Sequence, residues 1–133
     1  VLLMAMLPMV MAIGGMVGSQ ASTLIIRALT TNQRAPFRAV FSKEMLVSAT
    51  LALALGVVAG SNAMLLGADG HTALVMALAM ASDVVFAAGL GVAVPNLVKV
   101  LRIDPALIST PAVTALTDLT GAAIFLLLVT LLL

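Results

Sequence analysis

The chain has 133 residues, of which 63% are hydrophobic and 8% are charged, and its mean hydropathy is +1.29. Because soluble domains carry about 25% charged residues, this composition excludes an ordinary water-soluble domain and predicts that lipid surrounds much of the chain. The net charge is only +1 and 3% of the residues are aromatic, which argues against nucleic-acid binding. The chain has no cysteine, which excludes a disulfide, a thiolate metal site and a cysteine nucleophile.

Four apolar segments are long enough to cross a bilayer, which requires roughly 20 residues. We expect them at approximately 1–26, 43–66, 71–98 and 105–133. The first lacks the basic start of a signal peptide, so it is interpreted as a span, and Val1 as the boundary of a fragment of a longer protein. The sequence predicts an all-α, polytopic bundle of transmembrane helices that forms one domain over 1–133.

Three connections join these spans. The first, 27–43, contains loop-forming residues, and a short interfacial helix is expected at 37–41. The second, 67–70, reads as a tight turn. The third, 99–104, ends in an Asp-Pro pair, in which the aspartate can cap the next helix and the proline fits its first turn.

The basic residues occupy two of the three connections. All six are Arg27, Arg34, Arg38, Lys43, Lys99 and Arg102. With four spans, the first and third connections lie on one side of the membrane, and the second carries no Lys or Arg. The positive-inside rule then places 27–43 and 99–104 in the cytoplasm and the C-terminus outside.

Asp118 lies in the middle of the fourth segment, where a charged carboxylate costs roughly 3 kcal/mol or more. Thr110, Thr114 and Asp118 are spaced four residues apart, so they share one helix face, with Gly121 beside them. Mg²⁺ takes oxygen ligands and keeps several of its waters, and this stripe of oxygens suits it. The alternative is a protonated Asp118 that ties two helices together.

Asp83 is a second carboxylate at membrane depth, in the third segment. It could line the ion pathway, act as a proton-linked site, or hydrogen-bond to a Ser, Thr or Asn of another helix. His71 stands alone in a turn and is interpreted as a solvated residue at a helix start. The sequence has no Ser-His-Asp set, no paired-histidine zinc motif and no phosphate loop, so no enzyme is predicted.

The first segment contains a run of small residues. Gly14, Gly15 and Gly18 allow either close helix packing or a backbone whose carbonyls face a cavity. Gln20 and its neighbours add polar groups next to the glycines. Both interpretations stay open at this stage.

Two long motifs resemble a known family. The run Pro8-Met-Val-Met-Ala-Ile-Gly-Gly-Met-Val-Gly-Ser-Gln-Ala-Ser-Thr-Leu-Ile-Ile-Arg27 resembles the second transmembrane helix of the MgtE magnesium channels. The run Asp104-Pro-Ala-Leu-Ile-Ser-Thr-Pro-Ala-Val-Thr-Ala-Leu-Thr-Asp118-Leu-Thr-Gly resembles the start of their fifth helix. Lys43-Glu44 resembles the start of the third helix, and Pro95 matches a proline in the fourth.

The resemblance implies a multi-pass protein of the cell membrane that passes Mg²⁺, as a homodimer with five spans per subunit. Its pore would lie on the two-fold axis and be lined by the second and fifth helices, here the first and last segments with Gly14, Gly15, Gly18, Gln20 and Gly121. The first helix would then be missing from this chain. So would the cytoplasmic regulatory regions, an N-terminal domain and a CBS pair that sense Mg²⁺.

The resemblance also implies residue roles. Asp118 matches the pore aspartate that holds a hydrated Mg²⁺, and Thr114 a position whose carbonyl faces that ion. Thr110 replaces a polar pore residue, and Asp104 matches an acidic residue that binds Mg²⁺ on the cytoplasmic side.

Two residues depart from the family pattern. Met16 stands where many members have Asn, and a thioether is a poor ligand for a hard cation. Asp83 stands where an apolar residue is expected, which indicates a changed cation preference, coupling to another ion, or only a local packing difference. Three hypotheses follow: a divalent-cation channel, a proton- or sodium-coupled transporter that uses Asp83, and a non-transporting assembly module.

Overall fold

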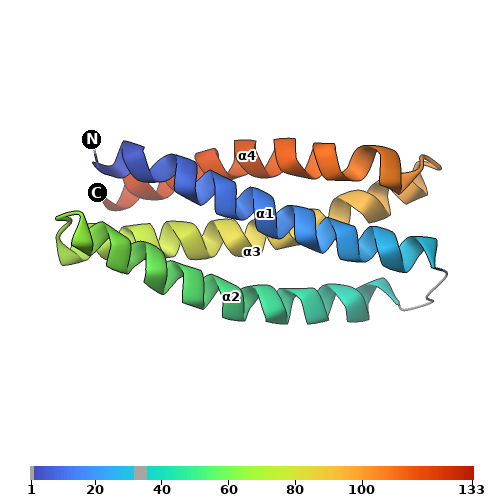
Figure 1. Ribbon diagram of the computed structural model, residues 1–133, viewed down its shortest axis with the longest axis horizontal. Coiled ribbons are helices and arrows are strands. Elements are labelled where there is room, and N and C mark those ends of the chain that lie inside the picture. The colour runs from blue at the N-terminus through green and yellow to red at the C-terminus, as the bar shows by residue number, and fades with distance from the viewer. Residues whose placement is uncertain (1, 32–35) are drawn as a thin grey trace.

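The computed structural model describes residues 2–31 and 36–133, so Val1 and Arg34 lie outside the described residues. Its helices are α1 (Leu2–Thr30), α2 (Phe37–Leu65), α3 (Gly70–Val100) and α4 (Pro105–Leu132). Each is long and apolar enough to cross a membrane, so the predicted all-α fold with four spans is confirmed. The helices lie lengthwise and alternate in direction, and α1 begins at the end where α4 finishes (Figure 1).

The helices extend beyond the predicted apolar segments, chiefly at the first connection. α1 continues to Thr30, and α2 already begins at Phe37. The prediction of a separate interfacial helix at 37–41 is therefore wrong, because these residues form the start of α2. Pro36 occupies the N-cap, and no proline interrupts the helix after it, so nothing stops the backbone from continuing as one helix.

Asp69 and Asp104 start the last two helices. The Asp69 carboxylate accepts hydrogen bonds from the backbone N–H of His71 and from the Thr72 hydroxyl, at 3.1 and 2.6 Å. The Thr72 side-chain bond is the main cause that lowers the pKa of Asp69. Asp104 accepts from the backbone N–H of Ala106 at 2.9 Å, with Pro105 in the first turn. The expected helix start at Asp-Pro is confirmed.

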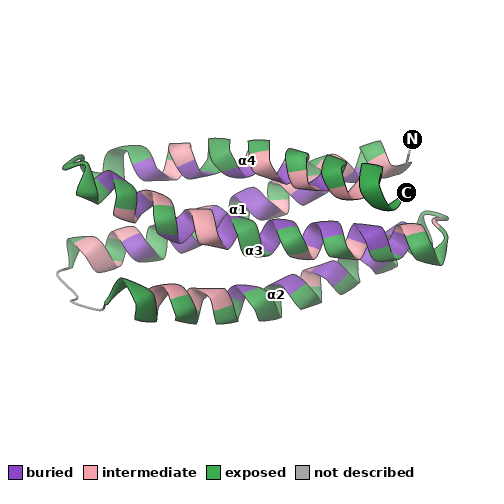
Figure 2. Ribbon diagram, turned by 180° about the vertical axis from the view of Figure 1, so that it is seen from behind, coloured by how far each residue is buried: buried purple, intermediate pink, exposed green. Residues whose placement is uncertain are grey.

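The packing centres on α3. It contacts the other three helices, and α1, α3 and α4 also contact one another, whereas α2 packs almost solely against α3. Buried residues concentrate where these helices meet, and the outward faces of α2 and α4 are exposed (Figure 2). The core holds Met76, Met80, Val84 and, from α1 and α4, Val10 and Phe125. The exposed apolar faces are those expected to meet lipid.

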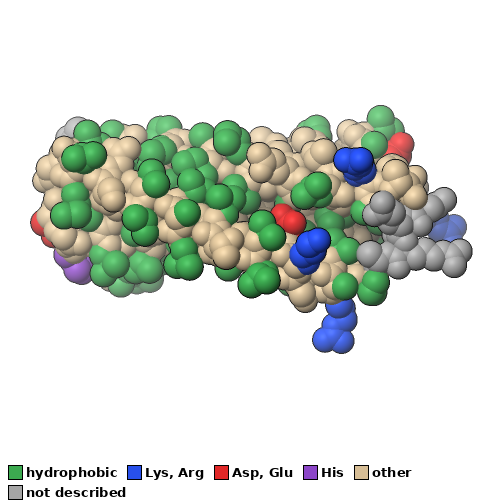
Figure 3. Space-filling view, turned by 60° about the horizontal axis from the view of Figure 1, so that its bottom comes forward, with side chains coloured by type: hydrophobic (Ala, Val, Ile, Leu, Met, Phe, Trp, Pro, Cys, Tyr) green, Lys and Arg blue, Asp and Glu red, His purple; other side chains and the backbone are tan. Residues whose placement is uncertain are grey.

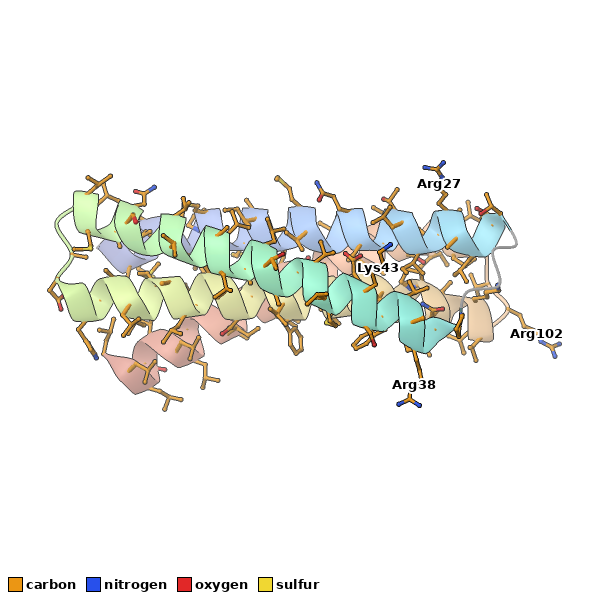
Figure 4. All side chains as sticks on the ribbon, turned by 90° about the horizontal axis from the view of Figure 1, so that it is seen from below. Arg27, Arg38, Lys43 and Arg102 are labelled. Atoms are coloured by element: carbon orange, nitrogen blue, oxygen red, sulfur yellow. The ribbon has the colours of Figure 1, made fainter. Side chains whose placement is uncertain are left out.

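Charge is distributed unevenly along the bundle. Lys and Arg side chains gather at one end, and the histidine lies at the other (Figure 3). Arg27, Arg38 and Arg102 point outward from the half of the bundle that contains the first and third connections, and Lys43 lies in the same half, between α1 and α2 (Figure 4). The arrangement of the helices therefore brings the basic residues of two separate connections together.

Candidate functional site

A groove of about 530 Å³ runs between α1 and α4. It is lined by Met11, Ala12, Gly15, Met16, Ser19 and Gln20 of α1 and by Thr114 and Asp118 of α4. The α1 residues recur every four positions, which places them on one helix face. Asp118 is half-buried in this groove and is its one carboxylate.

Gly15 brings the α1 backbone close to Asp118. A Cβ atom at position 15 would lie 3.5 Å from Asp118 Oδ1 and 3.8 Å from Thr117 Oγ1. This is ordinary van der Waals distance, so a methyl group would just fit, while a larger side chain would extend into the groove. The glycine therefore keeps open the space in front of the carboxylate.

Hydroxyl groups join the two walls of the groove. Ser19 Oγ and Thr114 Oγ1 lie 3.2 Å apart, and the Thr114 hydroxyl also donates to the Thr110 carbonyl at 3.1 Å. Ser19 is therefore the donor to Thr114. The Thr114 carbonyl in turn accepts a hydrogen bond from the buried Thr117 hydroxyl at 3.0 Å.

The structure brings together only some of the residues predicted for the site. Thr114, Asp118, Gly15 and Gln20 line the groove. Thr110 lies one turn before Thr114 and is not among the lining residues, although its carbonyl supports the Thr114 hydroxyl.

Asp104 is remote from the groove. It caps α4 at its exposed start, and the 14 residues to Asp118 correspond to about 21 Å along a helix.

Gly14, Gly18 and Gly121 face the interior of the bundle. A Cβ atom at Gly14 would collide with the Asp83 carboxylate, and one at Gly121 would lie 2.8 Å from Asp83 Oδ1. At Gly18 it would lie 2.8 Å from Thr117 Cγ2 and 3.1 Å from the Ala87 carbonyl oxygen. These glycines serve close helix packing.

Asp83 itself is fully buried in α3 and contacts both α1 and α4. Its exposed fraction is 0%, and within residues 2–31 and 36–133 neither carboxylate oxygen has a hydrogen-bond partner. The structure therefore does not show the interhelical hydrogen bond to a Ser, Thr or Asn that was one of its interpretations.

Ser19 and Met11 line the groove but were not predicted as site residues. Their spacing of four from Gly15 was the available signal, because residues at i−4 and i+4 share its face. In the part of the chain that the structure describes, no three His, Cys, Asp or Glu residues lie close enough to hold a metal ion. The chemistry of the groove therefore rests on one carboxylate, two hydroxyls and an amide.

Comparison with known proteins identifies the family. The family model MgtE, described as "Divalent cation transporter", matches residues 7–128. The chain belongs to the MgtE family. It is also 40% identical over 126 residues to the "Magnesium transporter MgtE" of Thermus thermophilus, an alignment that covers 90% of this chain and 27% of that relative. The chain thus spans about a quarter of the length of the relative, and it is a multi-pass membrane segment of an MgtE-family protein.

Met16 stands out within this MgtE-family groove. Its side chain lines the groove together with Gly15 and Asp118, and 61% of it is exposed. A thioether is soft and binds Mg²⁺ poorly. Met16 therefore presents an apolar surface beside the carboxylate.

Proposed function

We propose that the chain is the transport domain of a magnesium channel, in which Mg²⁺ passes along the groove between α1 and α4. The observation that carries this proposal is the half-buried carboxylate of Asp118, which faces the groove opposite Gly15. A carboxylate at membrane depth is costly unless it serves a cavity, a partner or an ion. The MgtE family and the Thermus thermophilus magnesium transporter support Mg²⁺ as the transported ion.

The donor set favours a hydrated ion. Mg²⁺ gives up its waters reluctantly and is commonly held by one or two carboxylates, with water in its other positions. Asp118 would accept hydrogen bonds from those waters, and Ser19, Gln20 and Thr114 would contact the same shell. Binding through water is weak enough for release, which conduction requires.

A homodimer completes the pathway in this proposal. The groove is open on one side, and each chain supplies one groove carboxylate. Two chains related by a two-fold axis would place two Asp118 side chains around one path, so that a divalent cation is balanced by two negative charges. Lipid would cover the exposed apolar faces of α2 and α4, and cytoplasmic Mg²⁺-sensing domains would regulate the pore.

The orientation proposed is that of the positive-inside rule. The end of the bundle that carries Arg27, Arg38, Lys43 and Arg102 (Figure 4) would face the cytoplasm, and the C-terminus would lie outside. In a cell membrane with a negative interior, Mg²⁺ then enters down its electrochemical gradient, and two charges gain about 4.6 kcal/mol per 100 mV. No further energy source is needed for uptake.

Flux into liposomes tests the proposed function. Wild type, Asp118→Asn and the control Asp69→Asn are reconstituted, and Mg²⁺ entry is followed with an internal fluorescent indicator. Asp118→Asn keeps the size of the side chain but removes the charge, so we expect flux to fall at least about tenfold, the loss of roughly 1.4 kcal/mol of ion stabilisation. Asp69 caps α3 outside the groove, so its variant should conduct normally. Unchanged flux in Asp118→Asn would refute the proposal.

The assembly hypothesis makes a different prediction in the same assay. If the acidic residues only hold helices together, neither wild type nor any variant will carry Mg²⁺. The coupled-transporter hypothesis predicts instead that flux collapses when a pH or Na⁺ gradient is removed.

A further inference from the structure

Asp83 occupies a site with no room for an ion beside it. Gly14 of α1 and Gly121 of α4 both press against its carboxylate so closely that a methyl group at either position would overlap it. No hydrogen bond reaches either oxygen within the described part of the chain. Gly14, Asp83 and Gly121 do not line the groove that contains Asp118. Asp83 therefore has no role in the pathway described above.

Within residues 2–31 and 36–133, no cationic side chain lies near Asp83 along the sequence of its own or a neighbouring helix. Asp118 is the only titratable residue of α4, and it is an acid. The remaining titratable residues of α1, α2 and α3 all lie near the ends of their helices: Arg27, Arg38, Lys43, Glu44, His71 and Lys99. Of these, Lys43 and Glu44 line a different groove, between α1 and α2. A charged Asp83 would therefore be a buried ion without a partner, which is strongly unfavourable.

The same helix contact separates Asp83 from Asp118. Gly14 contacts the Asp83 carboxylate. A Cβ atom added to the next residue, Gly15, would lie 3.5 Å from Asp118 Oδ1. On α4, Gly121 touches Asp83 only three residues after Asp118. The two carboxylates thus lie on either side of one α1–α4 contact inside the bundle, where electrostatic interactions are less screened than in water.

We propose that Asp83 is a proton-binding site that is linked to the groove, and that it releases its proton when Mg²⁺ binds beside Asp118. The empty protein holds Asp83 as the neutral acid. When the divalent cation enters, the O–H bond of this acid breaks and the proton passes to the water of the groove. The positive charge of the cation then stabilises the carboxylate that remains. This inference rests on the proposed function of the groove.

Linkage makes the effect reciprocal. If Mg²⁺ binding expels a proton, then added protons must weaken Mg²⁺ binding by the same factor. For one linked proton, the apparent Kd for Mg²⁺ rises up to about tenfold for each unit by which the pH falls. Acidification would therefore reduce cation occupancy of the groove.

Calorimetry measures the proton directly. Reconstituted protein is titrated with MgCl₂ at one pH in two buffers that differ in ionisation enthalpy, and the difference in heat gives the protons released per Mg²⁺ bound. Wild type should release protons. Asp83→Asn, which has the same shape but no acidic proton, should bind Mg²⁺ with little release and with an affinity that no longer follows pH. Equal proton release from wild type and Asp83→Asn would overturn the proposal.

A second variant and a spectroscopic measurement test the same proposal if Asp83→Asn does not fold. If Asp83→Asn is not folded by circular dichroism, Asp83→Leu offers a branched side chain of similar size without a titrating group. Infrared difference spectra of wild type should show that Mg²⁺ removes the carbonyl band of a protonated carboxylic acid, and the absence of this change would also overturn the proposal.

Asp118→Asn separates the two proposals. If it binds Mg²⁺ as tightly as wild type, the proposed function of the groove fails. If it loses binding while Asp83→Asn releases the proton as wild type does, the linkage alone fails.

Discussion

Gly91 lies where the backbones of α1 and α3 come close together, and its substitution should separate the two helices. A Cβ atom at this position would collide with the Gly18 carbonyl oxygen, and it would lie 2.7 Å from Ala21 Cβ and 3.1 Å from Ser22 N. Two of these three atoms belong to the α1 backbone and cannot rotate away as the end of a side chain can. Gly91→Ala therefore forces α1 to move.

Gly89 provides a matched control on the same helix. A Cβ atom there meets nothing within 4 Å. Both variants gain the same intrinsic helix propensity, about 1 kcal/mol for Gly→Ala, so this gain cancels when the two are compared. The difference isolates the steric cost, which is about 1–3 kcal/mol for overpacking. We expect Gly91→Ala to be less stable than Gly89→Ala by this amount, toward the upper end because backbone atoms are involved.

Equilibrium unfolding in mixed micelles tests this prediction. Circular dichroism is recorded as the denaturing detergent replaces the mild one, and the free energies of unfolding of wild type and the two variants are compared. Gly89→Ala should be as stable as wild type or more stable. If the two variants unfold within about 0.5 kcal/mol of each other, the spread expected of harmless substitutions, the close packing of α1 on α3 is refuted.

Three further predictions address the groove, a helix cap and the orientation. Met16→Asn places an amide oxygen beside Asp118 in place of a thioether, so it should tighten Mg²⁺ binding measured by calorimetry, and unchanged or weaker binding would contradict this role. Because the pKa of Asp69 is lowered, its contribution to stability is complete above its ordinary pKa of 3.8 and is lost as the pH falls through the lowered pKa. Asp69→Ala should therefore melt below wild type at neutral pH, and the two melting temperatures should converge in acid; a constant difference would count against it. The chain has no native cysteine, so His71→Cys should react with a membrane-impermeant thiol reagent added to intact cells, and Leu101→Cys should react only after permeabilisation.

The fold was predictable because hydropathy follows membrane depth. Each predicted span lies within or close to an observed helix, and the Asp-Pro start of α4 was located correctly because capping depends on neighbouring residues alone. The error at 37–41 arose where helix continues beyond the apolar region. The polar run Ser42-Lys43-Glu44 separates residues 37–41 from the apolar segment, but the helix continues through it, and hydropathy does not report backbone hydrogen bonds.

The candidate site was only partly predictable. A spacing of four residues is a property of the helix, so it placed Thr114 and Asp118 on one face, and both line the groove. Gly14 and Gly15 are adjacent in sequence but face Asp83 and Asp118 respectively. Which glycine faces which helix depends on how α1 is rotated against α3 and α4, and that rotation is set by packing across the whole bundle.

The isolation of Asp83 could not be inferred from the sequence for the same reason. Its residue type and depth showed that it was costly, and several polar residues on other helices were potential partners. Only the three-dimensional arrangement shows that glycines surround its carboxylate and that none of the described polar groups reaches it.

The position of a bound cation in crystals shows whether Mg²⁺ passes Asp118. Mn²⁺ can replace Mg²⁺ at oxygen sites, and its anomalous scattering identifies it without ambiguity in crystals of the protein. We predict a peak in the groove between α1 and α4, separated from the Asp118 carboxylate by a water molecule and absent in Asp118→Asn. A Mn²⁺ peak elsewhere in the membrane region, with the groove empty, would contradict it.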